Sequence, residues 1–428
     1  MYNGIAIEDF GKPVVLLANK GFVTDARSAA SSRGVPGIRV LGTSVPCETN
    51  VKSEIEAGVA AAMENIVGAL TKPLTPEEKS PKQQLAKLPR IAFTGSYEEV
   101  NRYFYGKGWT DGLAIAPPTE KAVAEMMTGT DLPADHVVAK LIPRLGKATI
   151  EKIAVNAVMA GALPTHMPLL ITAVQTLMDP RSRFDTFEVS TGSWAPFFVV
   201  NGPIRNDIHI NCGSGALSPG EIANAAIGRA LGLIVKNIGG ARKGVEDMGV
   251  FGNPGKYSLI LGEYEEESPW EPLHVERGFK KEDNTVTMFL PNTYIQTIPR
   301  DTNAQGFVET YASLNPGSMS CLLVVPSHAK VLASEGWTKK KIKEFILENS
   351  TSPFPPVQGG QGTPILPTKL SADDLMIVVA GGPGAWIGLL RSAGGWENSF
   401  VTRKIDLPRN WDKLVTKYKN IVPTYAGY

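Results

Sequence analysis

Short, continuous apolar runs that end at glycine, proline or asparagine are the feature that most constrains the fold of this chain. Clear examples are WAPFFVVNG, KYSLILG, SCLLVVP and LMIVVAGG, which begin at residues 194, 256, 320 and 375. Runs of this length and composition are typical of buried strands, and a turn or helix signal follows each of them. Because strands that alternate with helices pack in layers, we expect an α/β protein built from layered sheets and helices.

A small domain is expected at the N-terminus. The apolar runs PVVLLA and GIRVLG lie on either side of a helix-like segment, which predicts a β-α-β unit. Residues 50–70 then carry an apolar stripe at helical spacing that would cover its sheet. The stripe consists of Ile55, Val59, Ala62, Met63, Ile66 and Leu70. We therefore predict a small α/β domain over residues 1–70.

The composition changes after this helix. Residues 71–90, TKPLTPEEKSPKQQLAKLPR, are rich in Pro and Lys and poor in large apolar side chains, which favours a linker. With 428 residues, the chain also exceeds what one hydrophobic core usually organises. We predict that residues 91–428 form a second, larger mixed α/β domain with glycine-rich pocket loops.

The charge balance excludes several classes of partner. Lys and Arg total 43 against 42 Asp and Glu, so the formal net charge is +1 and no global field attracts nucleic acid or an anionic membrane. The N-terminal stretch has the features of neither a signal peptide nor a membrane span. We expect a cytoplasmic protein with a small-molecule substrate and no nucleic-acid or membrane partner. We also expect a homo-oligomer.

Three cysteines, Cys47, Cys212 and Cys321, are widely spaced and form no CxxC pair. This spacing argues against a disulfide framework and against a four-cysteine zinc site. Cys47 follows the second strand candidate, so it is a candidate nucleophile, although a lone cysteine is usually inert. The chain carries no HExxH motif, so we predict no metal site, and its sequence identifies no cofactor.

The segment NCGSGALSPGEIANAAIGRALGLIVKN, which begins at residue 211, predicts a helix with a glycine-rich entry. Ser218 is placed to cap this helix, Pro219 to occupy its first position and Glu221 to complete a capping box. Just before it, Gly213 and Gly215 allow the backbone to approach a ligand, and free amides at a helix start favour an anion. The alternative is a tight structural turn.

Polar residues upstream of that loop follow a strand, where side chains converge on bound molecules. Arg205 is the strongest of them, because a guanidinium can hold a carboxylate through two parallel hydrogen bonds. A plain surface position is the alternative for Arg205, and His209 has the setting of an ordinary strand histidine. The predicted substrate-binding residues of this region are Asn201, Arg205, Asn211, Gly213, Ser214 and Gly215.

An acidic segment supplies candidate acid–base groups. Five glutamates precede His274 within twelve residues, namely Glu263, Glu265, Glu266, Glu267 and Glu271. Crowded carboxylates beside an imidazole raise one another's pKa toward neutrality, as general acid–base catalysis requires. Trp270 and its flanking prolines would stiffen the segment and add an aromatic wall to the substrate site. We predict Glu263, Glu266 and His274 as catalytic residues, with a solvated acidic loop as the alternative.

A second glycine-rich turn lies in LMIVVAGGPGAWIGLL, which predicts a strand, a turn and a helix. Ligands in open α/β sheets collect at the carboxyl ends of strands, so Gly381, Gly382 and Gly384 are predicted to line the same pocket as the first glycine loop. A turn used only for packing is the alternative.

Several motifs, taken together and in order, resemble a bacterial family, the UGSC-like (seleno)proteins. They are GWTDGLAIAPPTEKAV, KIAVNAVMAG, NGPIR, GSGALSPG, IGRAL, PGKY, EESPWEPLHVERGF and VTRKIDLP. The resemblance extends from about residue 94 to the C-terminus. It implies an N-terminal α/β domain with a selenocysteine-glycine-serine-cysteine motif, similar to the selenocysteine subunit of glycine and betaine reductases, and redox or nucleophilic attack on a small substrate.

The chain departs from this family pattern at the redox motif. The segment DARSAASSRGVPGIRVL is similar to the helix and strand that follow the motif, but the corresponding positions, 16–19, contain no cysteine. Unless Cys47 substitutes, the resemblance implies that a thiol or selenol is lost or supplied by a redox partner.

Three function classes follow from these features. The first is an enzyme that cleaves or reduces a carbon–heteroatom bond of a small anionic organic molecule. The second is a lyase, hydratase or hydrolase that uses Glu and His for acid–base chemistry without redox. The third is a non-catalytic, ligand-binding subunit of a redox complex, which would have a pocket without a strongly perturbed titratable group.

Overall fold

The computed structural model of the chain describes residues 2–44, 51–79, 89–316, 319–350, 371–392 and 399–422. Its helices are α1 (Tyr2–Asp9), α2 (Val23–Ser32), α3 (Lys52–Thr71), α4 (Pro76–Lys79), α5 (Tyr97–Gly106), α6 (Glu120–Met127), α7 (Ile150–Ala160), α8 (Met167–Leu177), α9 (Phe184–Phe187), α10 (Ile204–Asp207), α11 (Ile222–Ile234), α12 (Leu273–Glu276), α13 (Ala304–Ser313), α14 (Pro326–Ser334), α15 (Lys339–Asn349) and α16 (Trp411–Tyr418). Its strands are β1 (Val15–Asn19), β2 (Arg39–Thr43), β3 (Val137–Leu141), β4 (Gly146–Thr149), β5 (Phe197–Asn201), β6 (Ile260–Gly262), β7 (Thr285–Phe289), β8 (Thr293–Thr297), β9 (Met319–Val324), β10 (Leu375–Val379), β11 (Ile387–Ser392) and β12 (Val401–Lys404).

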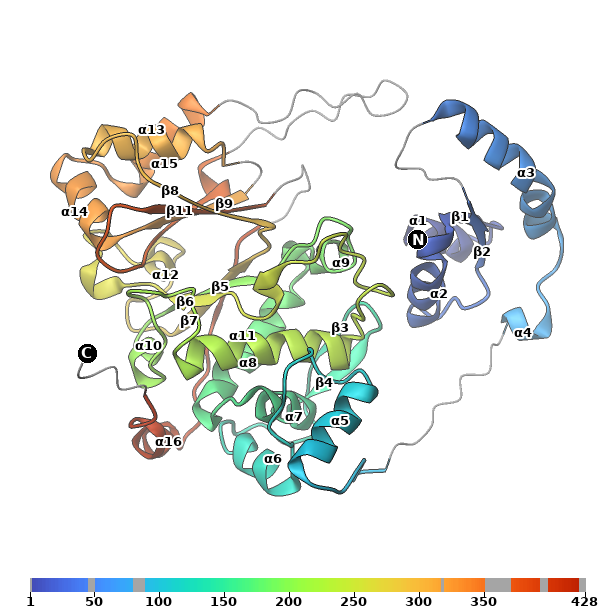
Figure 1. The fold of residues 1–428 in the computed structure, drawn as a ribbon, viewed down its shortest axis with the longest axis horizontal. Coiled ribbons are helices and arrows are strands. Elements are labelled where there is room, and N and C mark those ends of the chain that lie inside the picture. Colours follow the sequence, from blue (N-terminus) through green and yellow to red (C-terminus); the bar gives the residue numbers. More distant parts are fainter. Residues whose placement is uncertain are drawn as a thin grey trace.

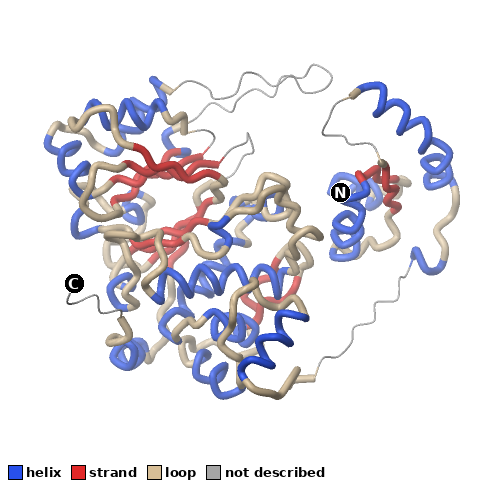
Figure 2. Tube along the Cα trace, in the orientation of Figure 1, coloured by secondary structure: helices blue, strands red, loops and turns tan. Residues whose placement is uncertain are grey.

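We call the described residues from 89 to 422 the large unit and those from 2 to 79 the small N-terminal unit. Two four-stranded mixed sheets form the centre of the large unit, with strand orders β12-β7-β5-β6 and β10-β9-β11-β8. The pairs β5–β6 and β9–β10 are parallel, and the other neighbours are antiparallel. Figures 1 and 2 show the two sheets stacked, with α13 to α15 outside one sheet and α7, α8 and α11 outside the other. The layers therefore run helices, sheet, sheet, helices, and the predicted layered α/β fold is confirmed.

The alternation of side chains along each strand produces these layers, because successive residues point to opposite faces of a sheet. Along β5, Phe198 and Val200 join the core that contains α7, α8 and α11. Phe197 and Val199 join the core between the two sheets. The residues of β10 divide in the same way between the inter-sheet core and the core of α13 to α15. Each central sheet is thus covered on both faces.

The apolar runs of the sequence become β5, β6, β9 and β10, and every residue of these strands is buried. The segment after Gly384 differs from its prediction, because it forms strand β11 and not a helix. β11 lies between β8 and β9 and is antiparallel to both. A place between two strands satisfies the backbone groups of β11 on both sides, and this tertiary pairing overrides the local pattern.

Helix α11 begins later than predicted. Its N-cap is Glu221, and no side chain caps it. The Ser218 amide instead donates to the carbonyl of Gly215 at 2.7 Å, in a turn where Gly215 has a φ of +68°. The predicted capping box at Ser218 and Pro219 is therefore wrong, because a glycine turn already uses the Ser218 amide.

The small N-terminal unit contains one parallel two-stranded sheet, β1–β2, and a minor core with Ile5, Ala30 and Ile38. Helix α3 contacts both strands, but none of its residues is buried. Val59 and Met63 of the predicted stripe are exposed. The stripe therefore covers the sheet only in part, because its large side chains turn outward.

Part of the predicted linker packs on the small unit. The Arg39 guanidinium donates to the Pro73 carbonyl at 2.9 Å and pairs with Glu78 at 3.3 Å. Residues 80–88 of the predicted linker lie outside the described residues. A contact with the large unit is made by the Ser28 hydroxyl, which donates to Glu246 at 2.9 Å. Within the described ranges, no helix is long and apolar enough to cross a membrane.

Candidate active site

Several of the predicted site residues meet where β5 and β6 end. Asn201 is the last residue of β5 and Glu263 follows β6, and the parallel pairing of these strands brings both to one edge of the sheet. The Asn201 amide donates to Glu263 at 2.6 Å and to Glu265 at 3.0 Å. The backbone amide of Leu273 also donates to Glu263, at 2.6 Å. We call the group Asn201, Arg205, Glu263, Glu265, Glu266 and His274 the acidic network.

Protein carboxylates neutralise the Arg205 guanidinium, which is only 3% exposed. Its Nε lies 3.0 Å from Glu265, and it donates to both carboxylate oxygens of Glu266 at 3.0 and 3.2 Å. It also donates to the carbonyl of Glu263 at 2.7 Å. These partners take the place that a substrate anion was expected to occupy, so the predicted anion receptor of Arg205 and the 213–215 loop has no support in this geometry.

Most polar atoms of the acidic network pair within the protein, but Asn201 Oδ1, Glu263 Oε1 and His274 Nδ1 are buried without a hydrogen-bond partner among the described residues. Hydrogen bonds from Arg205 lower the pKa of Glu266 to about 2, which is opposite to the rise expected from crowded carboxylates. His274 is fully buried, with Nε2 3.2 Å from the Lys281 carbonyl and Nδ1 4.0 Å from Glu265. Glu263 is equally buried, and the Lys339 ammonium lies 3.6 Å from it. The contacts are those of a structural ion-pair network.

Trp270 does not form a wall for these carboxylates. Its indole N–H donates to the Trp337 carbonyl at 3.0 Å, and its ring packs against the core of α13 to α15. The contacts of Trp270 in this structure are thus packing contacts with the helices outside the second sheet.

The first glycine loop is held by Asn224 of α11. The Asn224 amide group donates to the carbonyls of Asn211, Ala216 and Ile260, and its oxygen accepts from the Asn211 amide at 2.7 Å. The Asn211 side chain accepts from the Gly213 amide at 2.8 Å and donates to the Ser214 carbonyl. The polar groups of Asn211 and the Gly213 amide are thus used inside the loop.

Beyond these contacts, the two glycine turns come together as predicted. The carbonyl of Cys212 accepts from the Gly381 amide at 2.8 Å. Gly382 lies so close to Ser214 that an added Cβ would come within 1.8 Å of the serine hydroxyl. Gly215 and the 381–384 turn line one cavity of about 260 Å³.

The cysteines offer no activated thiol in the described part of the chain. Cys47 lies outside the described residues. Cys321 is buried, and Cys212 is half-buried beside Arg205. Burial raises the pKa of both thiols, and a thiol with a raised pKa is a poor nucleophile at neutral pH.

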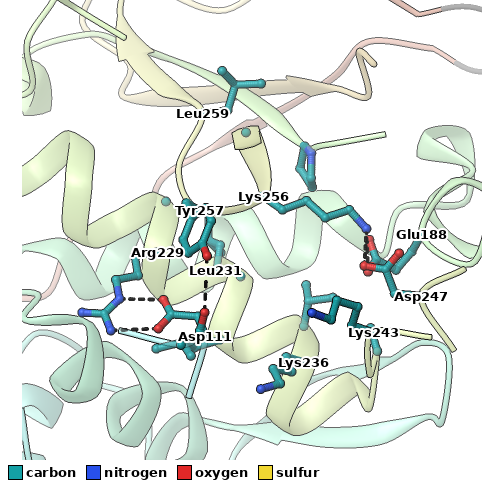
Figure 3. A pocket seen from close by; sticks show the side chains of 18 of the residues that line it. Asp111, Glu188, Arg229, Leu231, Lys236, Lys243, Asp247, Lys256, Tyr257 and Leu259 are labelled. Carbon is teal, nitrogen blue, oxygen red and sulfur yellow. Dashed lines mark hydrogen bonds and ion pairs between the residues drawn. The ribbon is translucent and has the colours of Figure 1, made fainter. Parts of the chain in front are cut away.

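A second cavity, of about 520 Å³, lies beside α11 and is lined by both basic and acidic side chains (Figure 3). Glu263, Glu266 and His274 do not line it. Its apolar wall includes Leu177, Phe198, Leu231, Leu233, Val235 and Leu259, and its charged side chains are Asp111, Glu188, Arg229, Lys236, Lys243, Asp247 and Lys256. The cavity is therefore lined by four basic and three acidic side chains in addition to its apolar wall.

Glu188 is the carboxyl group with the most altered titration in this cavity. It is only 5% exposed, and its nearest cation, Lys256, lies 3.5 Å away. Lys256 is closer to Asp247, at 2.6 Å. Burial raises the pKa of Glu188 to about 7, and the charge of Asp247 adds to this rise. Glu188 is therefore half-protonated near neutral pH, as a general acid or base should be.

At the opposite end of the cavity, Arg229 and Asp111 form an ion pair with two hydrogen bonds. The Arg229 guanidinium donates to both oxygens of Asp111, at 2.7 and 3.0 Å, and to the Ala114 carbonyl at 2.8 Å. The Tyr257 hydroxyl lies 3.5 Å from the Asp111 carbonyl. These contacts tie α11 to the loop after α5 and fix one wall.

Two lysines of the cavity lie between these ion pairs, as Figure 3 shows. Lys236 is half-buried and donates to the Thr110 carbonyl. Burial lowers the pKa of Lys236, the charge of Asp111 opposes this, and the nearby ammonium of Lys243 lowers it further. Among the described residues, no carboxylate lies within 4.0 Å of the ammonium of Lys236 or Lys243. Both amines remain available to a ligand.

Two glycines of α11 allow this cavity to form. Gly228 and Gly232 are four residues apart and so lie on one face of the helix. A Cβ at Gly228 would come within 2.7 Å of the Ser258 Cα, and one at Gly232 within 2.7 Å of the Lys256 carbonyl oxygen. The helix and the 256–258 segment therefore touch through backbone, and this contact brings Lys256 and Tyr257 to the cavity.

Reasoning from the sequence missed this cavity, although three quoted motifs meet in it. GWTDGLAIAPP supplies Thr110 and Asp111, IGRAL supplies Arg229, and PGKY supplies Lys256 and Tyr257. The available signal was a charged residue next to glycine in three separate motifs. Glu188 itself follows a four-residue helix, α9, and no pattern around it distinguishes it from other glutamates.

Comparison with known proteins gives one match. A family model described as the UGSC family matches residues 1–72, about a sixth of the chain. Neither a curated protein nor a solved structure matches. The matched residues include α1, β1, α2, β2 and α3 of the small unit, whereas the resemblance described from the sequence extends from about residue 94 to the C-terminus. The N-terminal part of this chain is thus similar to the UGSC family.

Proposed function

We propose that this protein is an enzyme that acts on a small anionic organic molecule in the 520 Å³ cavity, with Glu188 as the acid–base group. The observation that carries the proposal is a buried carboxyl group with a pKa of about 7 in a cavity of cationic excess. Strongly perturbed titratable groups in a cleft are typical of catalytic sites. The predicted small-molecule class is retained, and the site moves from the acidic network to this cavity.

Proton transfer is the chemistry that Glu188 and Lys256 support. A group with a pKa near the working pH is present in both protonation states, so it can accept and return a proton. Lys256 lies 3.5 Å from Glu188 and can stabilise the ionised form. Lys236 and Lys243, which have no carboxylate partner within 4.0 Å in the described part of the chain, would attract the substrate's anionic group.

A non-redox bond cleavage, as in a lyase, hydratase or hydrolase, fits these groups best. Neither Cys212 nor Cys321 lines the cavity. Reduction would need a thiol or selenol from a redox partner or from Cys47. We also propose a cytoplasmic location and a homo-oligomeric state. The same proposal includes two resemblances: that of residues 94–428 to the UGSC-like proteins, and that of the N-terminal part to the betaine reductase subunit.

The test begins with a panel of small carboxylates and phosphate esters, with binding measured by thermal shift and turnover by NMR. Glu188→Gln should lower kcat for a converted compound by roughly 10²-fold or more. Glu267→Gln is the control, because Glu267 pairs with Lys330 on the surface, outside the cavity. The proposal fails if no anion binds, or if Glu188→Gln turns over the substrate at the normal rate.

A ligand-binding subunit of a redox complex is the second candidate. It is favoured by the absence of cysteine from positions 16–19, where the resemblance places a redox motif. In that case an anion would bind the cavity without conversion, and Glu188→Gln would change its affinity only.

A further inference from the structure

We propose that Lys236 is a nucleophile that forms an imine with its substrate, so that the substrate class is a small oxo acid. This inference rests on the proposed function, because it assigns a substrate and a covalent step to the same cavity. Lys243 would hold the carboxylate of the oxo acid, and Lys236 would attack its carbonyl carbon.

The position of Lys236 suits this role. Helix α11 ends at Ile234 and continues as a π-helical turn, Val235–Gly239, which carries Lys236. Single π-helical turns are frequent at functional sites. The Lys236 ammonium donates to the Thr110 carbonyl, a neutral acceptor. Lys256 differs, because two carboxylates lie within 3.5 Å of its ammonium.

The surroundings of Lys236 also favour its neutral, nucleophilic form. A lysine becomes a nucleophile when it is desolvated or lies beside another cation. Lys236 meets both conditions, since it is partly buried in the cavity and the charge of Lys243 acts on it. Asp111 opposes the effect, but both of its carboxylate oxygens are already bound by Arg229.

The covalent step balances without a further reactant. The lone pair of the neutral Lys236 amine forms a bond to the carbonyl carbon, and the carbonyl oxygen takes a proton from Glu188. The nitrogen then returns a proton to Glu188, which passes it to the new hydroxyl, and the C–O bond breaks to release water and leave a protonated imine. The protonated imine gives its remaining N–H proton back to Glu188, so the nitrogen loses two protons in all and the water carries two away. An amine and a carbonyl thus give an imine and water, and Glu188 ends as it began.

Such an imine, once protonated, draws electrons from the carbon next to it. A bond from that carbon to a hydrogen or to another carbon can then break, with its electron pair taken up by the iminium. Glu188 is placed in the same cavity to remove or return the proton. This chemistry is a non-redox cleavage and agrees with the class proposed above.

Reductive trapping tests the inference directly. The full-length chain is incubated with glyoxylate, pyruvate or 2-oxoglutarate and sodium cyanoborohydride, and adducts are located by mass spectrometry of peptides. We expect at least one of these acids to give a stoichiometric secondary amine at Lys236. Lys236→Arg keeps the positive charge but cannot form an imine, so its trapping should fall at least tenfold. Lys330→Arg, at an exposed lysine that pairs with Glu267 outside the cavity, should still be trapped at Lys236.

Two further measurements separate the possible failures. Equal thermal unfolding of Lys236→Arg and the unmodified chain shows that the variant is folded, and reductive methylation at graded pH should label Lys236 at lower pH than the exposed lysines. The inference is overturned if labelling follows surface exposure alone, or if adducts persist in Lys236→Arg. Loss of turnover in Glu188→Gln without any trapped adduct would overturn the imine while leaving the proposed function intact.

Discussion

The acidic network and the cavity beside α11 both place glutamates next to basic side chains, but the two regions differ in how many donors each carboxylate receives. In the acidic network, Glu266 accepts two hydrogen bonds from Arg205, and its pKa falls to about 2. In the cavity, Glu188 has one lysine at 3.5 Å, and burial raises its pKa to about 7. Desolvation without a matching donor, and not the density of carboxylates along the chain, distinguishes a candidate acid–base group.

The largest effect on stability is expected from Arg205→Ala, which removes the cation from the acidic network. Glu265 and the Glu263 carbonyl would lose a buried partner. The free energy of unfolding should fall by about 3–5 kcal/mol, as for other broken buried ion pairs. Urea denaturation measures this, with Glu267→Gln as the exposed control. A loss below about 1 kcal/mol would show that the network is not structural.

Gly228→Ala probes the backbone contact that builds the cavity. The new methyl group would press on the Ser258 Cα, so we expect a loss of about 1–3 kcal/mol. The segment carrying Lys256 should also shift away from Glu188. Gly106→Ala is a suitable comparison, because nothing lies within 4 Å of a Cβ there. Equal stability of the two variants would contradict the proposed packing.

The pH dependence of stability sharpens the contrast for Glu188. Its pKa is about 7 in the folded chain, against 4.5 for an unperturbed glutamate. A group with a raised folded pKa stabilises the fold below its unfolded pKa, and this contribution is lost as the pH rises through the folded pKa. Unfolding free energy should therefore decline between pH 4.5 and 7 by at most about 3 kcal/mol. Glu188→Gln should remove this decline, measured by denaturation across that range.

Glu266 should give the smallest effect and the opposite sign. Its folded pKa of about 2 lies below the 4.5 of an unperturbed glutamate, so its stabilisation is complete above pH 4.5 and is lost as the pH falls toward 2. Because the side chain is 52% exposed, solvent screening should limit the effect to less than about 1 kcal/mol. Comparing Glu266→Gln with the unmodified chain at pH 3 and pH 7 checks both the sign and the size.

The two regions also show what could be read from the sequence alone. The apolar runs that became β5 and β10 were recognisable because strand formation depends on short-range composition and on turn residues at the strand ends. The layered α/β class followed from their alternation with helices. The same local reasoning was wrong for β11, whose conformation depends on the two strands beside it.

The sequence by itself therefore determined the strands and the class of fold, because both depend on short-range composition and on turn residues. The meeting of Asn201 and Arg205 with Glu263 came only from the parallel pairing of β5 and β6. Only the tertiary structure decided which carboxyl group is perturbed. Glu188, Lys236 and Lys256 lie far apart along the chain, and they meet because α11 and the 256–258 segment touch through glycine backbone. Burial and the number of nearby donors set a pKa, and neither quantity exists before the chain is folded.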